Sequence, residues 1–197
     1  MNLVCQDTQL NISTAYLRPG FAFGGSCLPK DLRATTYLAK MHDVEIPMLA
    51  GIMQSNRDHL ALALHKLLAL GRRKIGFIGL SFKTGTDDLR ESPLVTLAEQ
   101  LIGKGMQLAV YDPEVHLARL LGANRSFIER HLPHIGDMIR SEIQDVIAES
   151  EVLVLGLGGQ DVVDSLVRCC RPEQIVLDLV GLPDRQAIGA VVEGLCW

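Results

Sequence analysis

The sequence predicts an α/β protein in which a helical segment precedes a doubly wound parallel sheet. Residues 1–70 place apolar side chains at helical spacing, whereas short apolar runs alternate with helical stretches from Arg72 onward. Strands separated by helices cannot pair as hairpins, so they are expected to form a parallel sheet with helices on both faces. We therefore expect two domains, a helical region over 1–71 and an α/β domain over 72–197.

Two helices are expected in the first region. One runs from Leu28 to Lys40, with Pro29 in its first turn. The other runs from Pro47 to Leu70 and ends at Gly71; at 1.5 Å per residue it would be about 36 Å long. A helix of this length is as typical of a link between domains or a subunit interface as of the core of one domain, and both interpretations stay open.

The second region contains four expected strands, at 74–80, 107–112, 151–157 and 174–180. The expected helices lie at 92–105, 114–121, 141–150 and 161–170. Ser92 is expected to cap the first of these helices, with Pro93 at its first position.

Composition narrows the function classes. The formal net charge is -4 and no basic stripe is present, which argues against a nucleic-acid partner. Five cysteines at irregular spacing suit neither a disulfide framework nor a metal site, so reduced thiols in a cytoplasmic protein are expected. No apolar run reaches the roughly 18 residues that a membrane span needs. The N-terminal residues resemble an internal segment of a longer protein.

The α/β domain does not carry the glycine pattern of a dinucleotide site, which needs three glycines in a tight turn between strand and helix. Gly76 and Gly79 lie within the first strand, and the loop that follows, 81–91, is long and charged. Asp112 ends the second strand, as a ribose-binding acid would, but Asp-Pro also forms ordinary turns. The charged loop leaves the carboxyl end of a strand and is either a ligand loop or a solvated one. Its charged residues are Lys83, Asp87, Asp88, Arg90 and Glu91.

Cys27 stands at the N-terminal end of the first predicted helix, where the helix dipole and unpaired N–H groups favour a thiolate. Lys30 adds positive charge, and Asp31 lies on the same helix face, where it could orient a water molecule. Gly24 and Gly25 would let a ligand approach the backbone. A small buried cysteine in a glycine turn explains the same residues, so both interpretations stay open.

Two long motifs carry a family resemblance. The stretch 20–34, with its GGSC-x-PKD block, and the stretch 79–105, with FK-x(3)-DD-x-RES, together resemble the UDP-glucose/GDP-mannose dehydrogenase family. The run YLRPGFAFGG is similar to the branch of that family that oxidises GDP-mannose. The resemblance extends to the closing EGLCW, and it implies a Rossmann-like α/β domain after a helical dimerisation region.

The resemblance also implies an activity, the NAD-dependent oxidation of a sugar-nucleotide alcohol to the acid in two steps. Cys27 would be the nucleophile that captures the aldehyde as a thiohemiacetal, which becomes a thioester that water hydrolyses. Asp31 would assist proton and water handling near the sulfur. The implied substrate contacts are Tyr16, Arg18, Phe21 and Lys83, and the implied NAD contacts are Lys30 and Arg90. Homodimers would form through the central helices and share Arg18 across the interface.

The chain departs from the family in lacking its N-terminal NAD-binding domain, so we expect a C-terminal portion that is inactive alone. Three alternatives remain: a non-catalytic module that binds a nucleotide sugar or dimerises, part of a UDP-sugar 6-dehydrogenase, and a free-standing thiol enzyme. The last has little support, because His42, His59 and His65 show no partner pattern.

Overall fold

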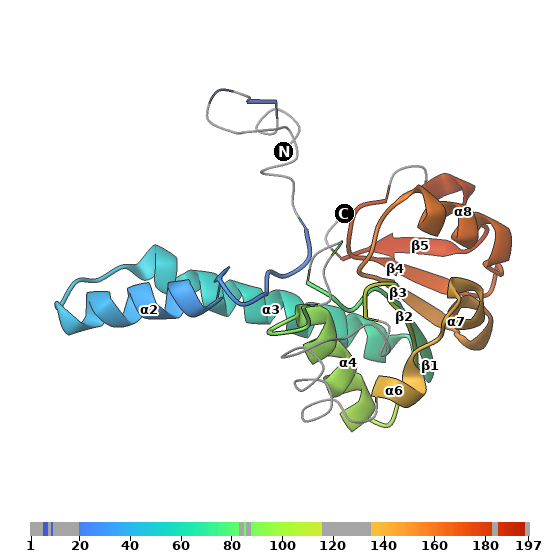
Figure 1. Ribbon diagram of the computed structural model, residues 1–197, viewed down its shortest axis with the longest axis horizontal. Helices are drawn as coiled ribbons and strands as arrows, with labels where there is room; N and C mark the ends of the chain where they lie inside the picture. The colour runs from blue at the N-terminus through green and yellow to red at the C-terminus, as the bar shows by residue number, and fades with distance from the viewer. Residues whose placement is uncertain are drawn as a thin grey trace.

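A pair of helices projects from a sheet that is covered by helices on both faces (Figure 1). The computed structural model describes residues 6, 7, 9, 20–82, 85, 88–115, 135–182 and 185–195. No helix within these ranges is long and apolar enough to cross a membrane. The predicted α/β class, with a helical segment ahead of a parallel sheet, is confirmed.

The sheet has five strands, all parallel, in the order β2-β1-β3-β4-β5. They are β1 (Lys74–Ile78), β2 (Gln107–Tyr111), β3 (Val152–Leu155), β4 (Ile175–Asp178) and β5 (Val191–Gly194). The first four fall inside the predicted runs. β5 was not predicted, because it is short and lies at the edge of the sheet, where its side chains alternate little between buried and exposed.

Helices cover both faces of the sheet, as predicted. On one face, α3 (Pro47–Ala69) and α4 (Pro93–Gly103) pack over the strands, and on the other lie α7 (Ile143–Glu149) and α8 (Gln160–Cys169). The short helix α6 (Ile135–Met138) and the 3₁₀ turn η1 (Arg185–Ala187) complete the described elements. Most of the predicted helix at 114–121 lies outside the described residues.

Ser92 precedes α4 as expected, but its side chain does not cap the helix. The hydroxyl instead donates to the carbonyl of Leu80 at 2.6 Å, in a buried position. The capping prediction is therefore wrong: the hydroxyl closes the neck of the loop between β1 and α4, where Leu80 and Ser92 face each other.

The helical arm consists of α2 (Leu28–Met41) and the N-terminal half of α3, which run antiparallel away from the sheet (Figure 1). The C-terminal half of α3 belongs to the core, where Ala63 and Leu67 are buried. Lys66 ties this half to β5, with its Nζ 2.8 Å from Glu193 and 3.0 Å from the carbonyl oxygen of Gly194. The core interpretation of the long helix therefore holds for its C-terminal half, whereas its N-terminal half extends into the arm.

Candidate functional site

A cleft of about 340 Å³ opens where the carboxyl ends of β1, β3 and β4 meet the segment that precedes α2. The strand order reverses between β1 and β3, and open parallel sheets place their ligands at such a point. Phe21, a predicted substrate contact, and Phe82 contribute aromatic rings to a mostly apolar lining. The lining residues are Gly20, Phe21, Ala22, Phe82, Pro93, Leu94, Gly156, Leu179 and Val180.

The segment that lines this cleft continues into Cys27, which is exposed at the N-cap of α2. The carbonyl of Cys27 accepts the N–H of Asp31 at 3.0 Å, and this bond closes the first turn of the helix. The hydroxyl of Ser26 lies 3.8 Å from the sulfur. Cys27 therefore lies at the start of a helix, as the sequence predicted.

The two other predicted residues of this helix start lie against each other. Lys30 Nζ is 3.4 Å from Asp31 Oδ1, and both side chains are more than half exposed. An exposed pair of this kind is worth little energy and opens easily, so either group can turn to a ligand.

Gly24 and Gly25 are crowded by protein. A methyl group on Gly24 would overlap the carbonyl oxygen of Glu91 and lie 2.8 Å from Pro93 Cδ. Gly25 has a φ of +87°, and a methyl group there would lie 2.8 Å from the ring of Phe82. We expected these glycines to admit a ligand; the space that they leave is filled by the loop that follows β1.

An ion pair joins α2 to the same loop. Arg33 donates to both carboxylate oxygens of Glu91, at 2.9 Å from Nη1 and 2.6 Å from Nη2. These hydrogen bonds lower the pKa of Glu91 and raise that of Arg33. Glu91 has a φ of +50°, so its backbone adopts a conformation that favours glycine.

The guanidinium of Arg90, a predicted NAD contact, turns back on its own loop. Its Nε and Nη2 lie 2.8 Å from the two oxygens of Asp88, and these side-chain hydrogen bonds lower the pKa of that carboxyl group. Three predicted substrate contacts, Tyr16, Arg18 and Lys83, lie outside the described residues, as does Asp87.

The carboxylate of Asp112 accepts hydrogen bonds from four backbone N–H groups. One carboxylate oxygen accepts the N–H groups of Leu80 and Ser81 at 2.8 and 3.1 Å. The other accepts those of Glu114 and Val115 at 3.1 and 3.3 Å. A ribose hydroxyl would have to compete with four backbone donors, so Asp112 does not fit the role of a ribose-binding acid.

A neighbouring cleft of about 230 Å³ lies beside Asp112 and is lined by acidic groups. Burial raises the pKa of Tyr111 at its edge, and the charges of Glu142, Asp112 and Asp161 raise it further. A pyrophosphate in this cleft would meet negative charge from Asp112, Glu114 and Asp161. Together with the long β1–α4 loop, this charge makes the cleft beside Asp112 a poor fit for a dinucleotide.

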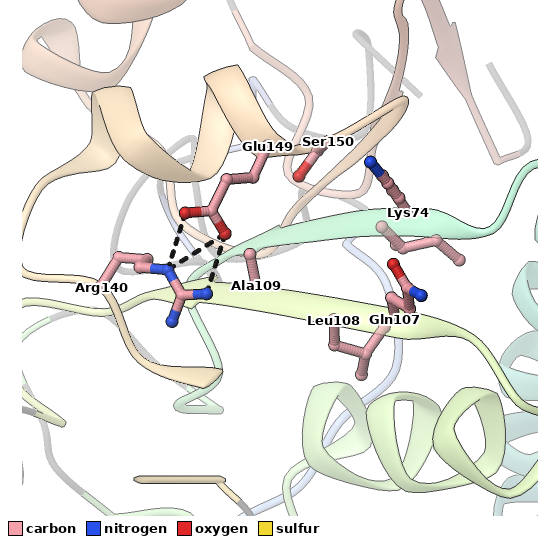
Figure 2. A pocket seen from close by; sticks show the side chains of 8 residues that line it. Lys74, Gln107, Leu108, Ala109, Arg140, Glu149 and Ser150 are labelled. Carbon is pink, nitrogen blue, oxygen red and sulfur yellow. Dashed lines mark hydrogen bonds and ion pairs between the residues drawn. The ribbon is translucent and has the colours of Figure 1, made fainter. Parts of the chain in front are cut away.

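A third hollow, of about 240 Å³, lies near the amino ends of β1 and β2. Figure 2 shows Arg140 and Glu149 pointing toward each other within it, with Nη2 and Oε2 2.8 Å apart. Arg140 lowers the pKa of Glu149 by hydrogen bonding. Because this hollow lies at the strand ends opposite to the Cys27 segment, it is separate from the candidate site.

One residue at the site was missed by sequence reasoning. Asn56, on α3, accepts the backbone N–H of Phe23 and donates to its carbonyl oxygen, both at 2.9 Å. Nothing in the sequence marks an asparagine in a helix as the partner of a residue 33 positions earlier.

Models of two domains match the chain. They are the central domain of the UDP-glucose/GDP-mannose dehydrogenase family, over residues 1–58, and the UDP binding domain of that family, over residues 76–178. The chain belongs to the UDP-glucose/GDP-mannose dehydrogenase family. The resemblance noted in its two motifs is thereby confirmed.

Relatives within the family match all or part of the chain. GDP-mannose 6-dehydrogenase from Pseudomonas aeruginosa is 50% identical over 197 residues, and the enzyme of that name from Azotobacter vinelandii is 44% identical. The chain spans 45% of the length of each. UDP-glucose 6-dehydrogenase from Rickettsia bellii is 35% identical over 107 residues, which is 52% of this chain and 25% of that protein.

Solved structures agree with this assignment. A ternary complex of GDP-mannose dehydrogenase from Pseudomonas aeruginosa matches 100% of this chain and 45% of that one, with a TM-score of 0.85 and 50% identity. A UDP-glucose dehydrogenase from Pyrobaculum islandicum has a TM-score of 0.75 at 24% identity, covering 100% of this chain and 43% of that one. The second match concerns the fold alone.

Proposed function

We propose that this chain is the C-terminal portion of a GDP-mannose 6-dehydrogenase, where it supplies the nucleotide-sugar cleft and the nucleophile. The observation that carries the proposal is the placement of Cys27, exposed at the start of α2, on the segment whose residues 20–22 line the cleft at the carboxyl edge of the sheet. The identity of 50% over the whole chain supports the choice of substrate.

The chemistry assigned to this chain is covalent capture. The sulfur of Cys27 adds to the aldehyde carbon of the half-oxidised sugar, and the carbonyl oxygen takes up a proton to give a thiohemiacetal. Asp31, in the first turn of α2, can assist that proton transfer, because its ion pair with Lys30 is exposed and weak. Capture keeps the reactive aldehyde from leaving the site between the two oxidations.

The oxidations of this family use NAD as the hydride acceptor. Because the cleft beside Asp112 is a poor fit for a dinucleotide, we assign no oxidation step to the α/β domain and expect no turnover by this chain alone. Lys30 is exposed at the start of α2 and remains a proposed contact to a dinucleotide held elsewhere, as does Arg90 once it leaves Asp88.

We also propose that the helical arm mediates a homodimer. Large apolar side chains of α2, the turn after it and α3 are exposed: Leu28, Tyr37, Leu38, Met41, Val44, Met48, Ile52 and Leu62. An arm with this much exposed apolar surface is expected to be covered by another protein surface, and a second copy of the chain offers a matching one.

Calorimetry with GDP-mannose, GDP and UDP-glucose tests the binding part of the proposal. We expect the chain to bind GDP-mannose more tightly than UDP-glucose. Phe21→Ala should weaken binding about tenfold, equivalent to about 1.4 kcal/mol, whereas Cys27→Ser should leave it intact. Tighter binding of UDP-glucose would favour a UDP-sugar enzyme, and binding of none of the three would leave dimerisation as the activity of the chain.

Alkylation of Cys27 tests the placement of the thiol. Saturating GDP-mannose should slow the reaction of Cys27 with iodoacetamide at least fivefold, because the bound sugar would cover the sulfur. Cys169 and Cys170, which are half-buried, serve as internal controls. Equal rates with and without ligand, under conditions where calorimetry shows saturation, would contradict the proposed location of the sugar.

A further inference from the structure

The cysteine segment is held at Phe23 by a single side chain of α3. The amide of Asn56 forms two hydrogen bonds with the backbone of Phe23: its Oδ1 accepts the Phe23 N–H and its Nδ2 donates to the Phe23 carbonyl oxygen, each over 2.9 Å and partly buried. A primary amide presents a donor and an acceptor side by side, as a neighbouring strand would. Neither a carboxylate nor a hydroxyl can supply the same pair in this geometry.

The next two residues of the segment rest on the α/β domain. Gly24 packs beside the carbonyl of Glu91, and Gly25 packs against the ring of Phe82. The segment is thus held by Asn56 at Phe23 and by the loop after β1 at the two glycines. Glycines lend the backbone little stiffness of its own, so the conformation of this segment depends on such external contacts.

Phe23 lies between the two functional ends of the segment. Residues 20–22 line the cleft, and Cys27 begins α2 four residues after Phe23. Loss of the hydrogen bonds to Phe23 would therefore loosen the backbone between the cleft residues 20–22 and Cys27. The core would be left intact, because Asn56 is not part of the buried apolar clusters.

We propose that Asn56 is a positioning residue, which fixes the segment 20–27 so that the Cys27 sulfur meets the sugar bound in the cleft. Asn56 acts through the backbone of Phe23 and touches no reacting atom. This inference rests on the proposed function, which supplies the reason why the thiol must be held in one place.

The test compares Asn56→Asp and Asn56→Ser with Gln54→Glu in the 197-residue chain. The aspartate keeps an acceptor for the Phe23 N–H but sets a carboxylate against the Phe23 carbonyl; the serine removes the amide without adding charge. Gln54→Glu makes the matching amide-to-acid change on the same helix, at an exposed residue that contacts Arg57 and Asp58.

Both Asn56 variants should raise the hydrogen-exchange rate of the Phe23 amide at least tenfold and weaken GDP-mannose binding at least threefold. They should also reduce, at least threefold, the protection that saturating GDP-mannose gives Cys27 against alkylation, because a loosened segment no longer holds the exposed sulfur against the bound sugar. Gln54→Glu should change none of these rates, and alkylation of Cys169 and Cys170 should stay constant throughout.

The possible failures are distinguishable. If the wild-type chain binds GDP-mannose but the Asn56 variants retain its affinity and the ligand protection of Cys27, the positioning role is wrong and the proposed function stands. If the wild-type chain binds no nucleotide sugar, the proposed function loses its binding step, and unchanged hydrogen exchange at Phe23 in the variants would still overturn the role of Asn56. Faster alkylation of the half-buried Cys169 and Cys170 in the Asn56 variants would indicate global unfolding and would overturn the local role.

Discussion

Gly24 offers the sharpest test of how the cysteine segment is docked. In Gly24→Ala the new methyl carbon would overlap the carbonyl oxygen of Glu91 and lie 2.8 Å from Pro93 Cδ and 3.1 Å from the Glu91 carbonyl carbon. Carbon atoms in contact are about 3.5–4.0 Å apart, so the two segments must separate by roughly 0.7 Å or more. The obstacle is mainly backbone, which cannot swing aside as a flexible side chain can.

Overpacking of this kind costs about 1–3 kcal/mol. We expect the free energy of unfolding to fall by about 2 kcal/mol, which lowers the urea midpoint by about 1 M if the slope is about 2 kcal/mol per molar urea. Far-UV circular dichroism in urea measures the midpoint, and the alkylation rate of Cys27 reports the segment itself.

Gly20→Ala is the matched control, because a methyl group on Gly20 meets nothing within 4 Å. Gly25→Ala separates two causes of strain. The atoms nearest to its methyl group belong to the ring of Phe82, which can shift, so most of its cost should come from the φ of +87°, at about 1–2 kcal/mol. If Gly24→Ala lies within 0.5 kcal/mol of Gly20→Ala and alkylates Cys27 at the wild-type rate, the packing explanation of Gly24 is refuted.

Four further predictions each concern one side chain. Asp112→Asn should destabilise the chain by about 3 kcal/mol in urea unfolding, because an amide cannot accept from all four backbone N–H groups that the carboxylate serves. Burial, and then the neighbouring Cys169, raises the pKa of Cys170 from 9.0 to about 11. The unfolded thiol therefore ionises first, and stability should decline between pH 9 and 11 by about 1 kcal/mol after allowance for partial exposure; Cys170→Ser should abolish this decline. Arg33 lowers the pKa of Glu91, so their contribution to docking should be present at neutral pH and lost as the pH falls through that lowered value. Hydrogen exchange at Glu91 should show this loss, and Glu91→Gln should remove its pH dependence. Leu38→Asp on the exposed arm should convert a dimer to a monomer in sedimentation velocity, whereas a monomeric wild-type chain would contradict the proposed interface.

The sequence predicted those parts of the fold that have local causes. Prolines mark the starts of α2, α3 and α4, because a missing N–H is tolerated in the first turn of a helix. β3 and the last four residues of β1 are buried apolar runs, as expected of a parallel sheet covered on both faces. β5 was not predicted, because this edge strand of four residues has no continuous apolar run and no proline marks its start.

The contacts that hold the site could not be predicted in the same way. The amide of Asn56 reaches Phe23 across 33 positions, and Arg33 reaches Glu91 across 58. Serine is a common helix cap, yet the hydroxyl of Ser92 donates to the Leu80 carbonyl, because the two ends of the loop between β1 and α4 lie next to each other. Such partners depend on how elements pack, which no local pattern specifies.

The contacts of the cysteine segment cross the domain boundary predicted between residues 71 and 72. Gly24 and Gly25 precede that boundary, but they pack against Glu91 and Phe82, which follow it. Asn56 holds the same segment at Phe23 from α3, whose C-terminal half is buried in the α/β core. The helical region therefore carries the thiol, while the α/β domain supplies the surface that fixes its backbone. Separation at the boundary would remove that surface, so the site belongs to the junction between the two regions and neither is expected to form it alone.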